Sequence, residues 1–351
     1  MRALKYAEGL MQMYDDVRLF FAYLGRTLTE FYGHGDELFA RWFKLTPDPA
    51  AKLQEIINTY PIDLVHSHNA PDSLTNLFID LFGNRIPIIH DIHDLLSTRR
   101  TPYQDGFNNR KSYQRIVEEE KSAIERSHAA IVVSDEILRI ISLAYQLPEK
   151  ALVFPNYIPQ RFVPKKLPEK NDVDYDRVRM VYQGFLSNNK GHYDLMDIFA
   201  AIGETGVELS IYPSRDNPTY RKFAADKPNI FYNNHLSPED LFPELTQYDF
   251  GWAGFNATFN SRHIDTVLPN KVFEYIACGL PVVIFPHKSL KAFLEIHNLG
   301  IIIEDVNELM AALLDNGIEI LRQNLIKNRN RFTIEAHIHQ VRQIYEQVMA
   351  S

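Results

Sequence analysis

The stretch Leu268–Phe285, with the sequence LPNKVFEYIACGLPVVIF, constrains the fold of this chain more than any other. Pro269 suits the first turn of a helix, where its missing N–H is not needed. Apolar residues then recur at helical spacing: Val272, Phe273, Ile276 and Ala277. Gly279 supplies the left-handed conformation that ends helices, and the apolar run after Pro281 is typical of a strand buried on both faces. The stretch therefore predicts a loop, a short helix and a central parallel strand.

Two charged residues, Lys271 and Glu274, lie on this otherwise apolar helix. They are three positions apart and share one face near the helix N-terminus. Free N–H groups and the helix dipole make such a terminus attractive to anions, so a phosphate there would offset Lys271. Glu274 could accept hydrogen bonds from two neighbouring hydroxyls, as a ribose presents. Residue types alone still favour a solvated Lys–Glu surface pair.

The order of residues along this stretch resembles the donor-binding segment of the family-four, or group 1, retaining glycosyltransferases. The matching residues are Glu274, Ala277, Gly279, Pro281, Val282 and Val283. The resemblance implies an α/β protein with the GT-B fold, in which two Rossmann-like, doubly wound parallel-sheet domains face a cleft. It also implies that Glu274 binds the ribose of a nucleotide sugar. We place Asn270, Lys271 and Gly184 among the other donor-binding residues.

Bulk properties fit such a protein. A chain of 351 residues with 45% hydrophobic residues suits two globular domains, and a net charge of −8 argues against a nucleic-acid-binding protein. The single cysteine, Cys278, excludes a disulfide framework and suits the cytosol. No apolar run is long enough to span a membrane, and charges at the N-terminus exclude a signal-peptide core. We therefore expect a cytoplasmic protein, with at most a peripheral membrane contact.

Strands and helices alternate along the chain, which is typical of doubly wound parallel sheets. Strands are predicted at Ile62–Val65, Pro87–Ile89, Ala129–Val133, Ala151–Phe154, Val178–Tyr182, Val207–Tyr212, Asn229–Tyr232, Phe250–Gly254, Val282–Phe285 and Gly300–Ile303. Helices are predicted at Ala50–Asn58, Ser73–Phe82, Tyr113–Arg126, Glu136–Tyr145, His192–Ile202, Pro238–Leu245, Val306–Leu314 and Ile334–Val348.

The domain organisation follows from this alternation. We assign 1–157 to an N-terminal acceptor-side domain and 177–330 to a nucleotide-sugar-binding domain. Pro- and Lys-rich residues 158–176 form the predicted linker. The resemblance implies that the last helix, within 331–351, crosses back to the first domain.

The N-terminal domain departs from the family at its start. Residues 1–15 predict a helix and 17–24 a strand, whereas the family begins with an earlier strand and a Gly-rich turn. A parallel sheet without that strand would leave two neighbouring strands with one unpaired edge each. We expect the missing strand and turn to lie upstream of Met1, and the chain as written to have impaired activity.

Polar residues follow several predicted strands, where open α/β sheets bind ligands. The resemblance gives His93 a role in placing the donor sugar, and we count it among the catalytic residues. His68, Asp94 and Asn156 are assigned to the acceptor or sugar side. His66-x-His68 and His90-x-x-His93 also suit a zinc site. The resemblance implies no metal, and we expect His66 and His90 to be structural.

Lys190, before Gly191, matches the family's Lys-Gly pair, which implies that it contacts the diphosphate and stabilises it as it leaves the sugar. The family commonly has an Arg after the preceding Gly, but this chain has Phe185. Lys271 or Arg262 could replace that cation.

The family's first glutamate, eight positions before Glu274, is replaced here by Thr266 with Asp265 beside it. We therefore assign Thr266 and Asp265 to an altered sugar pocket. Some branches of the family lack this first glutamate, so its loss does not decide against catalysis.

The functional prediction is transfer of a sugar from a nucleoside-diphosphate sugar to a hydroxyl, with retention. The acceptor is a glycan, a lipid or a small molecule, and no cofactor is needed because the nucleotide sugar is a substrate. The chain has no Ser-His-Asp order, P-loop or G-x-G-x-x-G turn. Two alternatives stay open: a catalytically impaired GT-B protein that binds nucleotide sugars or acts as a partner subunit, and, less favoured, a nucleotide-sugar epimerase.

Overall fold

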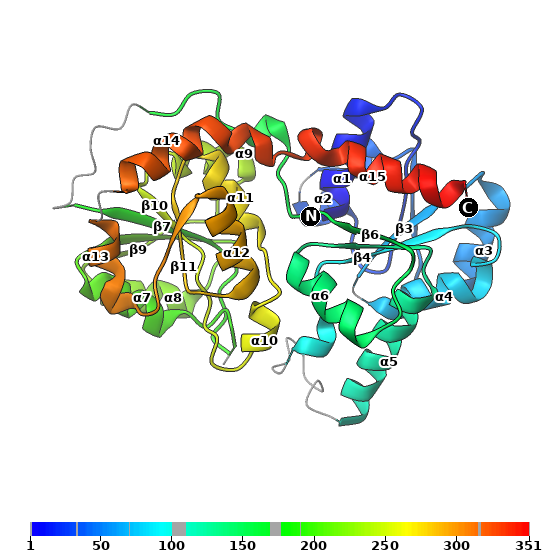
Figure 1. Cartoon of the computed structure of the whole chain (residues 1–351), viewed down its shortest axis with the longest axis horizontal. Helices are drawn as coiled ribbons and strands as arrows, with labels where there is room; N and C mark the ends of the chain where they lie inside the picture. The colour runs from blue at the N-terminus through cyan, green and yellow to red at the C-terminus, as the bar shows by residue number, and fades with distance from the viewer. Residues whose placement is uncertain are drawn as a thin grey trace. The chain divides into compact units, whose positions relative to one another are not determined.

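A computed structural model describes residues 2–32, 34–69, 71–99, 110–168, 177–189, 191–314 and 317–350 (Figure 1). Contacts divide the chain into two compact units. The first holds the described residues of 1–97, 109–159 and 333–351, and the second holds those of 98–108 and 160–332. Of the predicted linker, 169–176 lie outside the described residues. The chain passes from one unit to the other after Pro159 and returns after Phe332.

The first unit contains a four-stranded parallel sheet in the order β3-β4-β5-β6 and a separate parallel pair, β1-β2. Its strands are β1 (Phe20–Tyr23), β2 (Arg41–Lys44), β3 (Val65–His68), β4 (Ile88–Ile92), β5 (Ala129–Val132) and β6 (Lys150–Val153). Its helices are α1 (Arg2–Met13), α2 (Leu28–Tyr32), α3 (Pro49–Thr59), α4 (Asp72–Phe82), α5 (Arg110–Arg126), α6 (Asp135–Ala144) and α15 (Ile334–Met349). Every residue of β4 is buried, as expected for a strand inside a covered parallel sheet.

Within the described residues, four strands of the first unit have one edge without a partner strand. Strands β1 and β2 pair only with each other, and β3 and β6 are the edge strands of the four-stranded sheet. Because every open sheet has two edge strands, the missing strand inferred from the sequence stays a prediction.

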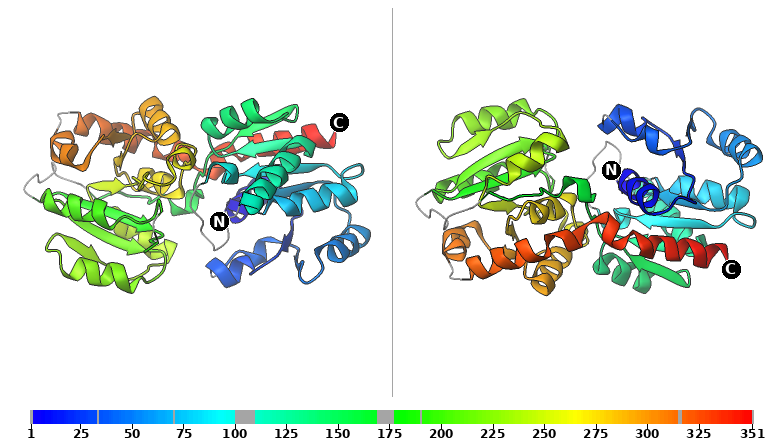
Figure 2. Two further views of the ribbon diagram at one scale, coloured as in Figure 1. Left: turned by 90° about the horizontal axis from the view of Figure 1, so that it is seen from below. Right: turned by 90° about the horizontal axis from the view of Figure 1, so that it is seen from above.

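The last helix, α15, packs in the first unit and lies alongside α1 (Figure 2). An isolated bridge joins Ile158 to Thr333, and the N–H of Ile334 donates to the carbonyl of Ile158 at 2.8 Å. Gly9 allows the approach of the two helices, because a Cβ there would meet Ile334 at 3.1 Å and Ile338 at 3.2 Å. Close packing of α1 against α15 therefore closes this part of the core.

The second unit is built on one six-stranded parallel sheet in the order β12-β11-β10-β7-β8-β9. Its strands are β7 (Arg179–Gly184), β8 (Glu208–Pro213), β9 (Ile230–Tyr232), β10 (Phe250–Trp252), β11 (Val282–Ile284) and β12 (Gly300–Ile302). Its helices are α7 (Met196–Glu204), α8 (Pro218–Ala225), α9 (Pro238–Leu245), α10 (Ser261–Ile264), α11 (Asn270–Ala277), α12 (Lys288–His297), α13 (Leu309–Leu313) and α14 (Ile318–Asn328). In the part of the chain that is described, no helix has the length and apolar character needed to cross a membrane.

Four helices of the second unit, α8, α10, α12 and α14, are absent from the sequence prediction. The start of α8 carries a signal that the prediction overlooked. Asn217 caps it by accepting from the N–H groups of Thr219 and Tyr220, and Pro218 follows at the first position. An N-cap followed by proline outweighs the weak apolar periodicity of this segment.

Strand positions differ in one respect that matters for function. The strand expected at Ile62–Val65 lies instead at Val65–His68, so His66 and His68 belong to β3. Likewise His90 and Asp91 lie within β4. The prediction stopped the strands at their first polar residues because buried polar side chains are costly. Here His66 and Asp91 lie 3.1 Å apart across β3 and β4, a contact that apolar patterning alone does not reveal.

Candidate functional site

The first predicted donor-site feature is the turn where β7 ends beside the start of α11. Gly184 adopts φ +133°, a conformation that favours glycine. A Cβ at this position would lie 3.3 Å from Lys271 Nζ. Gly184 and Lys271, 87 positions apart in sequence, are therefore brought together as predicted donor-binding residues.

Lys271 is a buried cation on the first turn of α11. Its side chain is 6% exposed, and Nζ has no hydrogen-bond partner among the described residues. Nζ lies 3.9 Å from the ring centroid of Tyr182 and 5.5 Å from that of Phe255. Burial lowers the pKa of Lys271 to about 7, although Glu274 acts in the opposite direction. An ammonium group in such surroundings is poised to bind an anion.

The depressed pKa of Lys271 makes stability depend on pH. Folding lowers this pKa from 10.5 to about 7, so between these values the unfolded chain binds more protons than the folded one. The free energy of unfolding should therefore rise from about pH 7 to about pH 9, relative to a Lys271→Met variant. Denaturant unfolding of both proteins across this range measures the difference. Parallel curves would contradict the burial of a titrating ammonium.

Glu274 lies one turn further along α11 and is held at the carboxyl end of β7. Its carboxylate accepts a hydrogen bond from the side-chain amide of Gln183. The backbone N–H of Gln183 donates to the hydroxyl of Tyr275 at 2.9 Å, and that hydroxyl donates to the carbonyl of Trp252 at 3.2 Å. Gly251 makes room for the ring, since a Cβ there would clash with Tyr275 at 2.4 Å. Gln183 and Tyr275 thus position Glu274, and sequence reasoning missed both.

The other predicted donor residues of this unit have different surroundings. Thr266 is buried, and its hydroxyl donates to the carbonyl of His263 at 2.7 Å. Asp265 accepts from the backbone N–H of Lys288 at 3.3 Å and forms an ion pair with its ammonium at 3.3 Å, which caps α12. Asn270 is half-buried at the start of α11. Lys190 lies outside the described residues. The donor roles of these four residues stay predictions.

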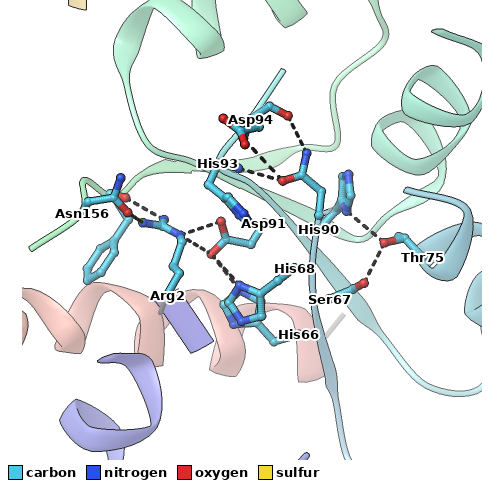
Figure 3. Close-up of polar contacts among 12 residues, drawn as sticks. Arg2, His66, Ser67, His68, Thr75, His90, Asp91, His93, Asp94 and Asn156 are labelled. Atoms are coloured by element: carbon cyan, nitrogen blue, oxygen red, sulfur yellow. Dashed lines mark hydrogen bonds and ion pairs between the residues drawn. The ribbon is translucent and has the colours of Figure 1, made fainter. Parts of the chain in front are cut away.

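The first unit holds a buried charge network centred on Asp91 (Figure 3). Arg2 Nε lies 2.8 and 2.9 Å from the two oxygens of Asp91, which is fully buried. The same guanidinium donates to the side chain of Asn156 at 3.1 Å and to the carbonyl of Phe154 at 2.7 Å. Burial would raise the pKa of Asp91, but Arg2 and His66 hold it well below its usual range. Asp91 is therefore a permanent anion, and Arg2 also fixes Asn156.

His66 and His90 behave as structural histidines, as the sequence predicted. His66 Nδ1 lies 2.6 Å from the hydroxyl of Tyr345 on α15, and its Nε2 lies 3.1 Å from Asp91. His90 lies 3.2 Å from Asp72 and 3.1 Å from Thr75. Both ring nitrogens of His66 therefore have hydrogen-bond partners, whereas His90 Nε2 lies within ion-pair distance of Asp72 without a hydrogen bond among the described residues.

His68, by contrast, stacks on His66 with ring centroids 4.4 Å apart and lies 3.6 Å from Asp91. Burial, reinforced by His66, lowers the pKa of His68 well below its usual range. The His68 side chain remains 23% exposed. A neutral imidazole on this edge of the sheet can exchange hydrogen bonds with a hydroxyl-bearing molecule.

His93 and Asp94 form the turn after β4, and Asn69 holds that turn. The side-chain oxygen of Asn69 accepts from the N–H of His93 at 3.1 Å, and its amide donates to the carbonyl of Asp94 at 2.7 Å. Burial lowers the pKa of His93, although Asp94 and Asp91 act in the opposite direction. His93 Nδ1 has no hydrogen-bond partner among the described residues. Asn69 was missed, although its place directly after a strand is the signal that could have found it.

His66, His68 and Asp91 also offer three metal-ligand atoms within 4.8 Å of one another. However, the Arg2 guanidinium covers both oxygens of Asp91 and supplies the positive charge that a metal would bring. Both nitrogens of His66 are engaged as well. This chemistry fits a hydrogen-bonded ion pair better than a zinc site.

Comparison with known families shows which proteins the chain is similar to. The family described as Glycosyltransferase Family 4 matches residues 2–161, and the one described as Glucosyltransferase 3-like, C-terminal domain, matches residues 198–332. Over residues 2–161 the chain is similar to the family 4 glycosyltransferases. This confirms the resemblance inferred from the segment around Glu274. No curated protein matches the sequence.

Solved structures show that the chain has the GT-B fold. HepE of Anabaena, in complex with UDP and glucose, has a TM-score of 0.70 at 13% identity, covering 98% of this chain and 95% of that one. Sucrose-phosphate synthase from Thermosynechococcus elongatus has a TM-score of 0.67 at 15% identity, covering 87% and 78%. WaaG, a glycosyltransferase involved in lipopolysaccharide biosynthesis, has 0.62 at 14% identity, covering 98% and 95%. The predicted α/β fold with two Rossmann-like domains is confirmed.

Proposed function

We propose that this glycosyltransferase moves a sugar from a nucleoside-diphosphate sugar to a hydroxyl acceptor, with retention of the anomeric configuration. The observation that carries the proposal is the buried ammonium of Lys271 at the N-terminus of α11. A helix N-terminus and an uncompensated cation both favour a phosphate. The structure of HepE with UDP and glucose supports this class of donor. Glu274 is placed one turn away to accept hydrogen bonds from a ribose.

The reaction exchanges one bond to the anomeric carbon for another. The bond to the diphosphate oxygen breaks, and its electron pair stays on the leaving diphosphate. The acceptor oxygen bonds to the same carbon from the same face, and its proton passes to the leaving phosphate oxygen. Lys271, together with Lys190, stabilises the charge that grows on the diphosphate. In this mechanism His93, kept neutral by burial, contacts the sugar.

Assays with radiolabelled UDP-, GDP- and ADP-sugars test the proposal. Transfer to an acceptor, or slow hydrolysis of one donor, is the expected result, and the configuration of the released sugar reports retention or inversion. Binding of a nucleoside diphosphate without transfer or hydrolysis would favour the catalytically impaired alternative. An acceptor-independent change in the sugar's configuration would favour the epimerase.

Replacing Glu274 by alanine should weaken nucleoside-diphosphate binding by about 2–4 kcal/mol, because two charge-assisted hydrogen bonds to ribose hydroxyls are lost. Glu274 is only partly buried, so the unfolding temperature should stay close to that of the wild type. Calorimetry with the free nucleoside diphosphate measures the affinity. Glu295→Ala, a change on the exposed face of α12, serves as the control. Unchanged affinity in Glu274→Ala would rule out the ribose role.

A further inference from the structure

One buried anion of the first unit, Asp91, faces two histidines (Figure 3). Asp91 lies on β4, and His66 and His68 lie on the neighbouring strand β3. Oδ2 of Asp91 is 3.1 Å from Nε2 of His66 and 3.6 Å from Nδ1 of His68. A different ring nitrogen of each histidine therefore faces the same carboxylate oxygen.

The charge of Asp91 decides which nitrogen of His66 carries the proton. A carboxylate only accepts hydrogen bonds, so the nitrogen beside it, Nε2, bears the hydrogen of the neutral ring. Nδ1 of His66 is then without a proton and accepts a hydrogen bond from the hydroxyl of Tyr345 at 2.6 Å. Both contacts of His66 are thus satisfied by a single tautomer.

The same reasoning gives His68 the opposite tautomer. Its ring is neutral, because burial lowers the pKa of His68 well below its usual range. A lone pair on Nδ1 would be repelled by the permanent anion 3.6 Å away, whereas a hydrogen there is attracted to it. The ring is held by stacking on His66 at 4.4 Å and by contact with the ring of Tyr6 at 5.6 Å, both between ring centroids. Nε2 of His68 is therefore the nitrogen without a proton.

This second nitrogen of His68 lies where a ligand can use it. His68 is the last residue of β3, and open parallel sheets bind ligands outside the carboxyl ends of their strands. Its side chain is 23% exposed, although Nδ1 itself is buried and has no hydrogen-bond partner among the described residues. His66 offers no such position, because Tyr345 occupies its bare nitrogen. A nitrogen lone pair selects a group that donates a hydrogen bond, such as a hydroxyl, over an anion.

We propose that Asp91 is a positioning residue that holds the proton of His68 on Nδ1, and that Nε2 of His68 accepts a hydrogen bond from the hydroxyl of the acceptor. The identity of the ligand rests on the proposed function, whereas the tautomer does not. This hydrogen bond orients the acceptor oxygen. A ring with a strongly lowered pKa is a weak base, so the hydroxyl proton still passes to the leaving phosphate oxygen.

Nitrogen NMR of the full chain, labelled at histidine, tests the tautomers without any substrate. The wild type should show a protonated Nδ1 and a bare Nε2 for His68, and the reverse for His66; spectra of His66→Gln and His68→Gln assign the signals. In Asp91→Asn the preference of His68 for Nδ1 should weaken, because the anion is gone. An unchanged preference in this variant, or a proton on Nε2 of His68 in the wild type, would overturn the role of Asp91. If Asp91→Asn does not fold, the wild-type spectrum decides.

Kinetics with the donor and acceptor found in the assays above test the ligand. His68→Phe keeps an aromatic ring but removes the accepting nitrogen, so it should raise the KM for the acceptor by about 3–10-fold, the equivalent of one neutral hydrogen bond. His68→Gln, whose amide oxygen can accept, should recover most of the loss. Tyr345→Phe is the control, because it takes the hydroxyl from His66 but leaves Asp91 beside His68. It should keep both the tautomer of His68 and the KM of the wild type.

The outcomes separate the inference from the proposed function. An unchanged acceptor KM in His68→Phe would overturn the ligand assignment and leave the proposed function in place. A rise in Tyr345→Phe as large as that in His68→Phe would show that the network only supports the fold, and would also overturn the assignment. If the wild type uses none of the donors, the proposed function fails and the ligand assignment fails with it, while the NMR spectra decide on Asp91 alone.

Discussion

Replacing Arg2 by methionine should lower the free energy of unfolding by about 3–5 kcal/mol, because the variant leaves Asp91 buried and charged without its cation. The variant also lacks the hydrogen bonds that Arg2 donates to the Phe154 carbonyl and the Asn156 side chain. Denaturant unfolding near neutral pH measures the effect. The loss in free energy of unfolding should exceed the loss caused by removing any single exposed ion pair.

Arg342→Met is the matched control, since Arg342 also contacts a carboxylate, that of Asp16 at 2.7 Å, but the Asp16 side chain is 65% exposed. Arg342→Met should lower the free energy of unfolding by less than about 1 kcal/mol. The wild type should lose its advantage over Arg2→Met as the pH falls. Its Asp91 has a depressed pKa, so the stability gained from ionisation is present above the unfolded pKa and is lost as the pH falls through the folded pKa. Equal costs for the two variants would show that the Arg2 network adds nothing beyond a surface pair.

Replacing Lys271 by methionine should reduce turnover by about 10²–10³-fold, because a preorganised charge facing the leaving diphosphate is removed. The same change should raise the free energy of unfolding of the ligand-free protein, since it removes a buried cation that has no hydrogen-bond partner among the described residues. Steady-state kinetics with the donor identified from the panel, together with denaturant unfolding, measures both effects.

Lys291→Met on α12 is the control for Lys271, because Lys291 is exposed and contacts only Glu295 at 3.9 Å among the ion pairs described. It should change neither turnover nor stability appreciably. A Lys271→Met enzyme with normal turnover would exclude the diphosphate role. A loss of both stability and activity would instead indicate that Lys271 supports the fold.

Local sequence signals determined much of the second unit. Pro269 precedes α11, and Gly279 follows it with φ +74°, as the stretch around Glu274 predicted. Strand β11 follows as a fully buried run. Such features depend on residues within a few positions of one another, so caps, glycines and apolar spacing reveal them. The split of the first unit's strands into a two-stranded and a four-stranded sheet was not predicted, because the alternation of strands and helices does not determine which strands pair.

The surroundings of each charged residue were decided by the tertiary structure alone. Arg2 meets Asp91 across 89 positions, and His66 meets Tyr345 across 279. From residue types Lys271 resembled a surface lysine, yet Tyr182 and Phe255 enclose it. No local pattern encodes these contacts, because the cost of burying a charge depends on side chains that only the folded chain brings together. For the same reason the sequence named Lys271 and Glu274 but could not find Gln183, whose side-chain amide reaches Glu274 across 91 positions.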